Sequence, residues 1–156
     1  MSDPRKRTRA FSLIELVIVV VIIGIIGAMA IPRMSRGSKG ASENALRGDL
    51  AVLRNSIELY AAEHDGDYPT LLNFELLLET YSDSASNPNP SRTATFEFGP
   101  YIHSIPAAPV GPSKGLTTVG AIPGAGIAWV YDAITGKIVI YDGGETDSKG
   151  VPFSSY

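Results

Sequence analysis

The first feature of the chain is an apolar run longer than a strand or a core helix needs. From Leu16 to Ile31 no residue is charged, and most residues are valine or isoleucine. A helix through residues 11–31 would be about 31 Å long at roughly 1.5 Å per residue, which is enough to cross the hydrocarbon core of a membrane. The pattern therefore predicts a transmembrane helix over residues 11–32.

After a short polar stretch, apolar residues return at alternating spacings of four and three, which is typical of one helix face. The members of this face are Leu46, Leu50, Leu53, Ile57 and Tyr60. Glu43 and Arg47 lie one helical turn apart on the outer side of the same helix, and this spacing predicts an ion pair that stabilises the helix. Residues 64–67 end the helix, with Gly66 as its C-terminal cap. The apolar face is expected to carry the rest of the domain.

Leucines at helical spacing predict a short second helix over residues 71–81. Either Thr70 or Asn73 is suited to cap its start, because their side-chain oxygens can accept amide hydrogen bonds. This helix is expected to pack against the long one through Leu72, Leu76 and Leu77. The residues that follow, 82–91, are rich in Ser, Asn and Pro and predict a polar surface loop.

Branched and aromatic residues mark two strands near the end of the chain, residues 127–131 and 137–141. The short Gly-containing segment between them gives the pattern of a β-hairpin. Two strands alone are marginal, so they need a third strand or the long helix beneath them. The predicted fold class is therefore α+β: a long N-terminal helix, transmembrane in its first half, packed against a small antiparallel sheet. The Gly-rich residues 111–126 have no predicted place in it.

Charge is unevenly distributed along the 156 residues, whose formal net charge is −3. Residues 1–10 carry four basic residues and one acid, so the remaining chain, with nine bases and fifteen acids, has a net charge of −6. Its bases form no stripe suited to nucleic acid, which is not expected as a partner. Basic residues before the apolar run predict a cytoplasmic N-terminus and translocation of everything after Pro32. There is no cysteine, and hence no disulfide.

One carboxylate, Glu15, lies inside the predicted transmembrane segment, where a charge costs a few kcal/mol on insertion scales. A secretory signal peptide shares the basic start. Its apolar core, however, is only about 7–15 residues long and ends at a small-residue cleavage site, unlike residues 31–34 here. An ordinary single-pass membrane anchor does not require an acidic residue such as Glu15. Glu15 is therefore predicted to be functional.

Residues 9–16, Arg-Ala-Phe-Ser-Leu-Ile-Glu-Leu, resemble the N-terminal signature of type IV pilins and type II secretion pseudopilins. The resemblance implies that a prepilin peptidase cleaves between Ala10 and Phe11 and that the new Phe11 amine is methylated. Glu15 then becomes the fifth residue of the mature chain and offers a counter-charge to the Phe11 amine of a neighbouring subunit. The family usually has Gly before the cut, so Ala10 predicts slower processing.

Two residues of the apolar helix fall where the family often has a loosening Gly and a kinking Pro. These are Gly24 and Pro32, and the resemblance implies that the helix unwinds between them when the subunit moves from membrane to filament. A packing role for Gly24 remains open, because Gly24 and Ala28 form a small-xxx-small pair. Further along, residues 60–70 and 101–106 resemble segments of the major (G-type) pseudopilins.

The resemblance implies a leader (1–10), a transmembrane assembly helix (11–32), an exported half of the long helix (33–64) and a pilin-like globular domain (65–156). The implied function is that of a type II secretion pseudopilus subunit, a homopolymer that drives protein export. It would sit in the inner membrane with its C-terminal domain in the periplasm. Its partners would be the prepilin peptidase, the inner-membrane assembly platform with its ATPase, and minor pseudopilins. Two alternatives stay open: a type IV pilus pilin for adhesion, motility or DNA uptake, and a membrane-tethered binding module.

Catalytic chemistry is not expected. His64 and His103 are the only histidines, and no metalloprotease, nucleophile-elbow or P-loop motif occurs. The acidic segment 142–148 does contain candidate calcium ligands, Asp142, Glu145 and Asp147, because Ca²⁺ prefers hard oxygen ligands. Major pseudopilins bind Ca²⁺ in a C-terminal loop of this kind, although the spacing here does not match closely. The alternative is a solvated acidic turn, and no other cofactor is expected.

Overall fold

The computed structural model describes residues 12–156, and for residues 29–37 it describes the backbone alone. The chain falls into two compact units, one up to Ser38 and the other from Lys39 onward. The predicted leader, residues 1–10, and the predicted cleavage site between Ala10 and Phe11 lie outside the described residues. The first unit contributes one stretch of helix, and the second holds the core and every strand that the structure describes.

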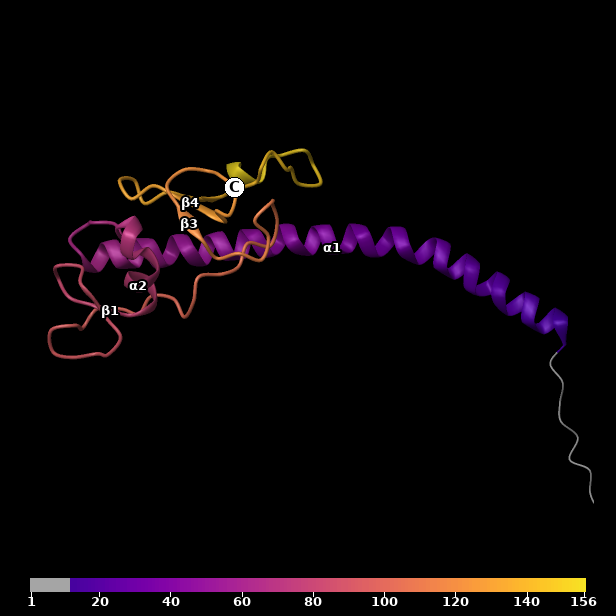
Figure 1. The fold of residues 1–156 in the computed structure, drawn as a ribbon, viewed down its shortest axis with the longest axis horizontal. Helices are drawn as coiled ribbons and strands as arrows, with labels where there is room; N and C mark the ends of the chain where they lie inside the picture. Colours follow the sequence, from indigo (N-terminus) through magenta and orange to yellow (C-terminus); the bar gives the residue numbers. More distant parts are fainter. Residues whose placement is uncertain (1–11) are drawn as a thin grey trace, which may run out of the picture. The chain divides into compact units, whose positions relative to one another are not determined.

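Helix α1 spans Leu13–Glu63 (Figure 1). Its backbone is helical at both Gly24 and Pro32, so the predicted unwinding between them is not seen here. Among the residues that the structure describes, no helix is long and apolar enough to cross a membrane. The predicted transmembrane segment, 11–32, includes Phe11 and the side chains of residues 29–32, which lie outside that description.

The end of α1 confirms the predicted cap. The Gly66 amide donates a hydrogen bond to the Ala61 carbonyl at 2.8 Å, which satisfies one of the last carbonyls of the helix. Gly66 has a φ of +94°, a left-handed conformation that costs a residue without Cβ little. The chain can therefore reverse direction directly after α1 and return along it.

The second unit is built around the predicted apolar face of α1. Its five members, from Leu46 to Tyr60, are all 0 or 1% exposed. They join a core to which the second helix and the sheet contribute Phe74, Leu77, Leu78, Trp129, Tyr131, Ile138 and Ile140. Burying a large apolar side chain stabilises a fold by roughly 1.5–3 kcal/mol, so this face holds the unit together. The spacing of four and three predicted it correctly.

The predicted second helix exists but differs in detail. It begins as a 3-10 turn, η1 (Leu71–Asn73), continues as α2 (Phe74–Glu79), and ends two residues earlier than predicted. Because a 3-10 turn has three residues per turn, it shifts the phase of the side chains that follow. Of the three leucines expected to pack, Leu77 is buried as predicted, but Leu72 and Leu76 are exposed, and Phe74 and Leu78 are buried instead. Neither predicted cap, Thr70 or Asn73, makes a side-chain capping hydrogen bond.

The main sheet has the order β3-β4-β5, with β3 (Val119–Gly120), β4 (Trp129–Tyr131) and β5 (Ile138–Ile140). Strands β4 and β5 are antiparallel, with Trp129 opposite Ile140, and confirm the predicted hairpin. Strand β3 is parallel to β4, however, so the prediction of a purely antiparallel sheet was wrong. The Thr118 carbonyl accepts hydrogen bonds from the amides of Ala128 and Trp129, which aligns the starts of the two strands.

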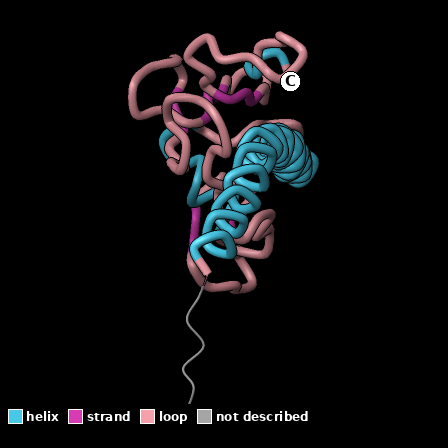
Figure 2. Tube along the Cα trace, turned by 90° about the vertical axis from the view of Figure 1, so that its right-hand side faces the viewer, coloured by secondary structure: helices cyan, strands magenta, loops and turns pink. Residues whose placement is uncertain are grey.

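A second, two-stranded sheet lies where the end of the second helix, Tyr81, and the loop 82–91 were predicted. Strands β1 (Tyr81–Ser82) and β2 (Pro88–Asn89) pair antiparallel, and Asp83 organises the turn between them. The Asp83 carboxylate accepts hydrogen bonds from the amides of Ala85 and Asn87. In Figure 2, short strands stand among long loops, and η2 (Phe153–Ser155) lies near the end of the chain.

Candidate assembly surface and tail network

The apolar stretch of α1 in the first unit is fully uncovered. Every large apolar side chain from Leu13 to Ile26 is between 48 and 81% exposed. Soluble monomers rarely expose contiguous apolar surface on this scale, and such surfaces mark protein or membrane contacts. This stretch is the candidate assembly surface.

Glu15 lies in the first turn of α1 and already has a partner in its own chain. The Ser12 amide donates a hydrogen bond to Glu15 Oε2 at 3.1 Å. Ser12 and Glu15 have the Ser-x-x-Glu spacing of a capping box, in which the acid satisfies a free amide at the helix start. A carboxylate there also interacts favourably with the helix dipole. The sequence prediction missed this role, although the spacing could have revealed it. The predicted partner of Glu15, the Phe11 amine of a neighbouring subunit, lies outside the described residues.

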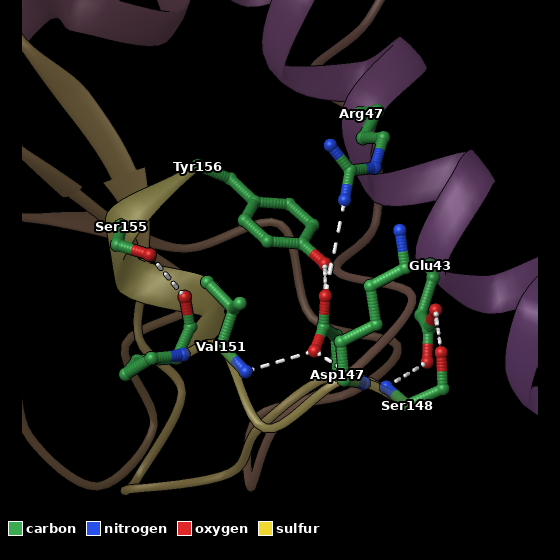
Figure 3. A network of polar contacts seen from close by, with 9 residues as sticks. Glu43, Arg47, Asp147, Ser148, Val151, Ser155 and Tyr156 are labelled. Atoms are coloured by element: carbon green, nitrogen blue, oxygen red, sulfur yellow. Dashed lines mark hydrogen bonds and ion pairs between the residues drawn. The ribbon is translucent and has the colours of Figure 1, made fainter.

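A network of polar contacts in the second unit is centred on the buried carboxylate of Asp147 (Figure 3). This carboxylate accepts hydrogen bonds from the amides of Lys149 and Val151, both at 2.8 Å, and from the Tyr156 hydroxyl at 2.6 Å. The Arg47 guanidinium lies 4.0 Å from the carboxylate and 4.0 Å above the centre of the Tyr156 ring. We call the residues 145–156, held in this way, the tail.

Glu43 makes a second contact between α1 and the tail. It is buried, and its two oxygens accept hydrogen bonds from the Ser148 amide at 2.8 Å and the Ser148 hydroxyl at 3.0 Å. The predicted ion pair between Glu43 and Arg47 was therefore wrong, because each side chain turns to a different residue of the tail. The buried contact of Glu43 with Ser148, 105 residues away in sequence, outweighs a weak ion pair between residues one helical turn apart.

Arg54, about two turns beyond Arg47 along α1, also reaches the end of the chain. Its guanidinium donates hydrogen bonds to the carbonyl oxygens of Ile138, at 3.1 Å, and Tyr156, at 2.8 Å. The planar guanidinium can bridge two acceptors in this way because its donors have a fixed fork geometry. Arg54 thus joins α1, strand β5 and the tail.

The structure does not bring the three candidate calcium ligands together. Asp142 is buried and accepts hydrogen bonds from the amides of Gly144, at 2.9 Å, and Ser154, at 2.8 Å. Glu145 is exposed, and the Asp147 oxygens are occupied as described above. Within the described residues, no group of three or more acidic or histidine side chains is placed to hold a metal ion. The buried carboxylates of Asp142 and Asp147 act here as hydrogen-bond acceptors.

The two histidines have separate environments. His64 is buried and stacks on the Tyr60 ring, with ring centroids 3.9 Å apart. Its Nδ1 lies 2.9 Å from the Tyr60 carbonyl oxygen and its Nε2 3.2 Å from the Ser82 hydroxyl. His103 is exposed. The contacts of His64 join the end of α1 to strand β1, which is a packing role.

Acid should weaken the tail network. The hydrogen bond from the Tyr156 hydroxyl, helped by two backbone amides and by Arg47, holds the pKa of Asp147 below its usual value. A depressed pKa stabilises the fold above the unfolded value, about 3.9, and the stabilisation is lost as pH falls through the folded value. We expect Asp147→Asn to lower the denaturation midpoint at pH 7 and the difference from wild type to shrink near pH 3.

The measurement is chemical denaturation of the full chain in detergent at both pH values. Glu145→Gln is the matched control, because it removes an exposed carboxylate from the same tail. The control should leave the midpoint at pH 7 unchanged. A difference between wild type and Asp147→Asn that is the same at both pH values would contradict the role given to this carboxylate.

Residues 5–31 match the family model described as the prokaryotic N-terminal methylation motif. This motif is typical of type IV pilins and pseudopilins, and it indicates a pilin-like protein that a prepilin peptidase processes. It implies filament assembly in general. No curated protein and no solved structure matches the chain.

Proposed function

We propose that this protein is a structural subunit of a type II secretion pseudopilus, which polymerises through α1 to drive the export of proteins. The observation that carries the proposal is the uncovered apolar stretch from Leu13 to Ile26, in a chain with the methylation motif. An apolar surface of this extent has to be shielded from water. The lipid bilayer covers it before assembly, and neighbouring copies of α1 cover it in a filament.

In this proposal the precursor is a single-pass inner-membrane protein. The basic residues before the apolar run keep the N-terminus in the cytoplasm, and the unit from Lys39 onward lies in the periplasm. The prepilin peptidase removes residues 1–10, and an inner-membrane platform with its ATPase adds the subunit to the filament. Minor pseudopilins complete the assembly.

The freed amine of Phe11 and the carboxylate of Glu15 from a neighbouring copy set the register. Unit charges 4 Å apart attract by about 4 kcal/mol at an effective dielectric of 20, much of which offsets desolvation. The pair therefore acts mainly through specificity, because a slipped arrangement leaves a charge without a partner in apolar surroundings. A head-to-tail contact of this type does not close on itself and so builds a helical filament.

A secretion pseudopilus is favoured over a surface pilus by three features of the sequence. Residues 68–70, Tyr-Pro-Thr, and residues 101–106, Tyr-Ile-His-Ser-Ile-Pro, resemble the major pseudopilins. The chain also has no cysteine for the C-terminal disulfide found in many pilins. A deletion strain separates the two functions: loss of exported proteins supports the proposal, and loss of surface pili or motility with normal export contradicts it. The third alternative, a membrane-tethered binding module, would keep its function in a strain without the prepilin peptidase.

Processing is the first step that can be tested. We expect mass spectrometry of the membrane-extracted protein to find a chain that begins at Phe11 and carries a methyl group on its amine. In a strain without the peptidase, residues 1–10 should remain attached and filaments should be absent. If residues 1–10 remain attached in the strain that has the peptidase, the Phe11 amine never forms and the assembly mechanism fails.

A further inference from the structure

Three apolar side chains of the second unit stand out in solvent. Leu72 in η1 is 91% exposed, and Ile134, in the turn between β4 and β5, is 89% exposed. No large apolar side chain that the structure describes is more exposed than these two. Leu76, one turn after Leu72, is 51% exposed. We call Leu72, Leu76 and Ile134 the end patch.

Three contacts hold the β4–β5 turn against the segment that contains η1. The Tyr131 hydroxyl donates a hydrogen bond to the Pro69 carbonyl at 3.0 Å, and the Phe74 ring packs on the Tyr131 ring with centroids 4.4 Å apart. Gly136, which has a φ of +68°, lies so close to the Tyr68 ring that a Cβ at this position would overlap it. The segments that carry the end patch are therefore packed together.

The turn presents Ile134 in a fixed position. The Asp132 carboxylate accepts hydrogen bonds from the Ile134 amide at 2.9 Å and from the Thr135 hydroxyl at 2.7 Å. Turns favour glycine and polar residues, and an isoleucine that points into solvent adds nothing to the core. Residues that break a local rule in this way are expected at functional sites. Because the turn is ordered and a β-branched side chain has few rotamers, covering Ile134 would cost little conformational entropy.

The segments that carry the end patch are acidic. Residues 55–91 include seven acids and no lysine or arginine. Glu75, between the two leucines of the patch, is exposed, and so is Asp67. The β4–β5 turn adds Asp132, and Lys137 at its end is the one base on these segments. An apolar patch among acids is complementary to an apolar side chain that lysines or arginines flank.

The charge of the second unit argues against two other occupants. From Lys39 onward the chain has seven bases and fourteen acids, so its net charge is 7 − 14 = −7, which disfavours the second unit of another copy. Anionic lipid headgroups are disfavoured for the same reason. We infer that the end patch is a docking site for a different protein, through a surface on which lysines or arginines flank an apolar side chain. This inference goes beyond the proposed function and does not depend on filament assembly.

Two designed peptides test the inference on the full chain in detergent. One is a helix of leucine and lysine with leucines along one face, and the other has glutamate in place of lysine. Fluorescence anisotropy should show binding of the lysine peptide only. Leu72→Ser with Ile134→Ser should weaken this binding by about tenfold or more, because two apolar contacts are lost. Leu116→Ser with Ile122→Ser, the control, removes two exposed apolar side chains outside the end patch and should leave binding unchanged.

A charge reversal gives an independent measurement. Glu75→Lys should weaken binding of the lysine peptide by roughly fivefold, because an attraction becomes a repulsion. The difference from wild type should disappear at high salt, which screens exposed charges. Glu145→Lys is the control: it changes the net charge equally but lies in the tail, so its effect should be smaller. Both acids are exposed, so both variants should unfold at the wild-type temperature.

Cross-linking in cells identifies the occupant. With benzoylphenylalanine in place of Leu72, irradiation should attach the chain to a segment of another protein that carries lysine or arginine. Adding Glu75→Lys should remove that product. Cross-links only to a second copy of this chain, to lipid or to a segment without basic residues would overturn the inference, and so would no cross-link at all.

The outcomes separate this inference from the proposed function. Equal effects of the two serine pairs or of the two lysine variants, or equal binding of the two peptides, would overturn the inference and leave the pseudopilus proposal unchanged. Failure of the wild-type chain to form filaments with its assembly machinery present would refute the proposed function. The end patch would then still bind the lysine peptide, because each subunit carries the whole patch.

Discussion

Replacing Glu15 with alanine is expected to leave the chain processed and inserted in the membrane but to reduce filament yield by about a hundredfold. Removing one partner of a buried ion pair costs about 3–5 kcal/mol, since the other charge stays buried alone. In the proposed filament, that other charge is the Phe11 amine of the neighbouring copy. Filaments sheared from cells give the yield, and mass spectrometry of the membrane fraction shows that processing is intact.

Glu15→Gln distinguishes the ion pair from the local role of Glu15. The Ser12 amide bonds to the Glu15 side chain in the subunit, and a Gln at this position of a capping box can accept the same bond. Glutamine has no charge, however, and cannot neutralise an amine. We expect Glu15→Gln to assemble as poorly as Glu15→Ala. Normal assembly of the Gln variant would refute the charge-pairing mechanism and leave capping as the function of Glu15.

Replacing Trp129 with alanine is expected to destabilise the second unit by about 3–5 kcal/mol, the usual range for removing a buried Trp. Trp129 is 0% exposed in the core, and its indole nitrogen donates a hydrogen bond to the Pro106 carbonyl at 2.8 Å. The substitution therefore leaves a cavity beside α1 and an unsatisfied carbonyl. Thermal unfolding of the full chain in detergent, followed by circular dichroism, measures the loss.

Ile134→Ala is the matched control for this prediction. Ile134 lies between strands β4 and β5, in the same hairpin as Trp129, but is 89% exposed. Removing its side chain should change stability by about 0.5 kcal/mol or less. Equal effects of the two substitutions would mean that the hairpin is not packed on α1 as the structure describes.

Structural features that depend on residues close together in the sequence were predicted well. The buried face of α1, the cap at Gly66 and the β4–β5 hairpin each follow from spacing within a few residues, where the backbone itself brings the groups together. The 3-10 start of the second helix was not predictable from its leucines. Because a 3-10 turn has a different hydrogen-bond pattern from an α-helix, it rotates the side chains about the helix axis. Leu72 is therefore exposed and Phe74 is buried.

The sequence alone determined the long helix, its uncovered apolar start and the acid at Glu15, because these follow from hydrophobicity and local spacing. The methylation motif likewise occupies one continuous segment. Only the tertiary structure decided that Glu43 of α1 binds Ser148 of the tail and that Arg47 of α1 pairs with Asp147 of the tail. The two ends of these contacts are about a hundred residues apart, so no local pattern encodes them. They arise because the folded core brings α1 and the tail together, and a buried carboxylate there needs donors that neighbours in its own helix do not supply.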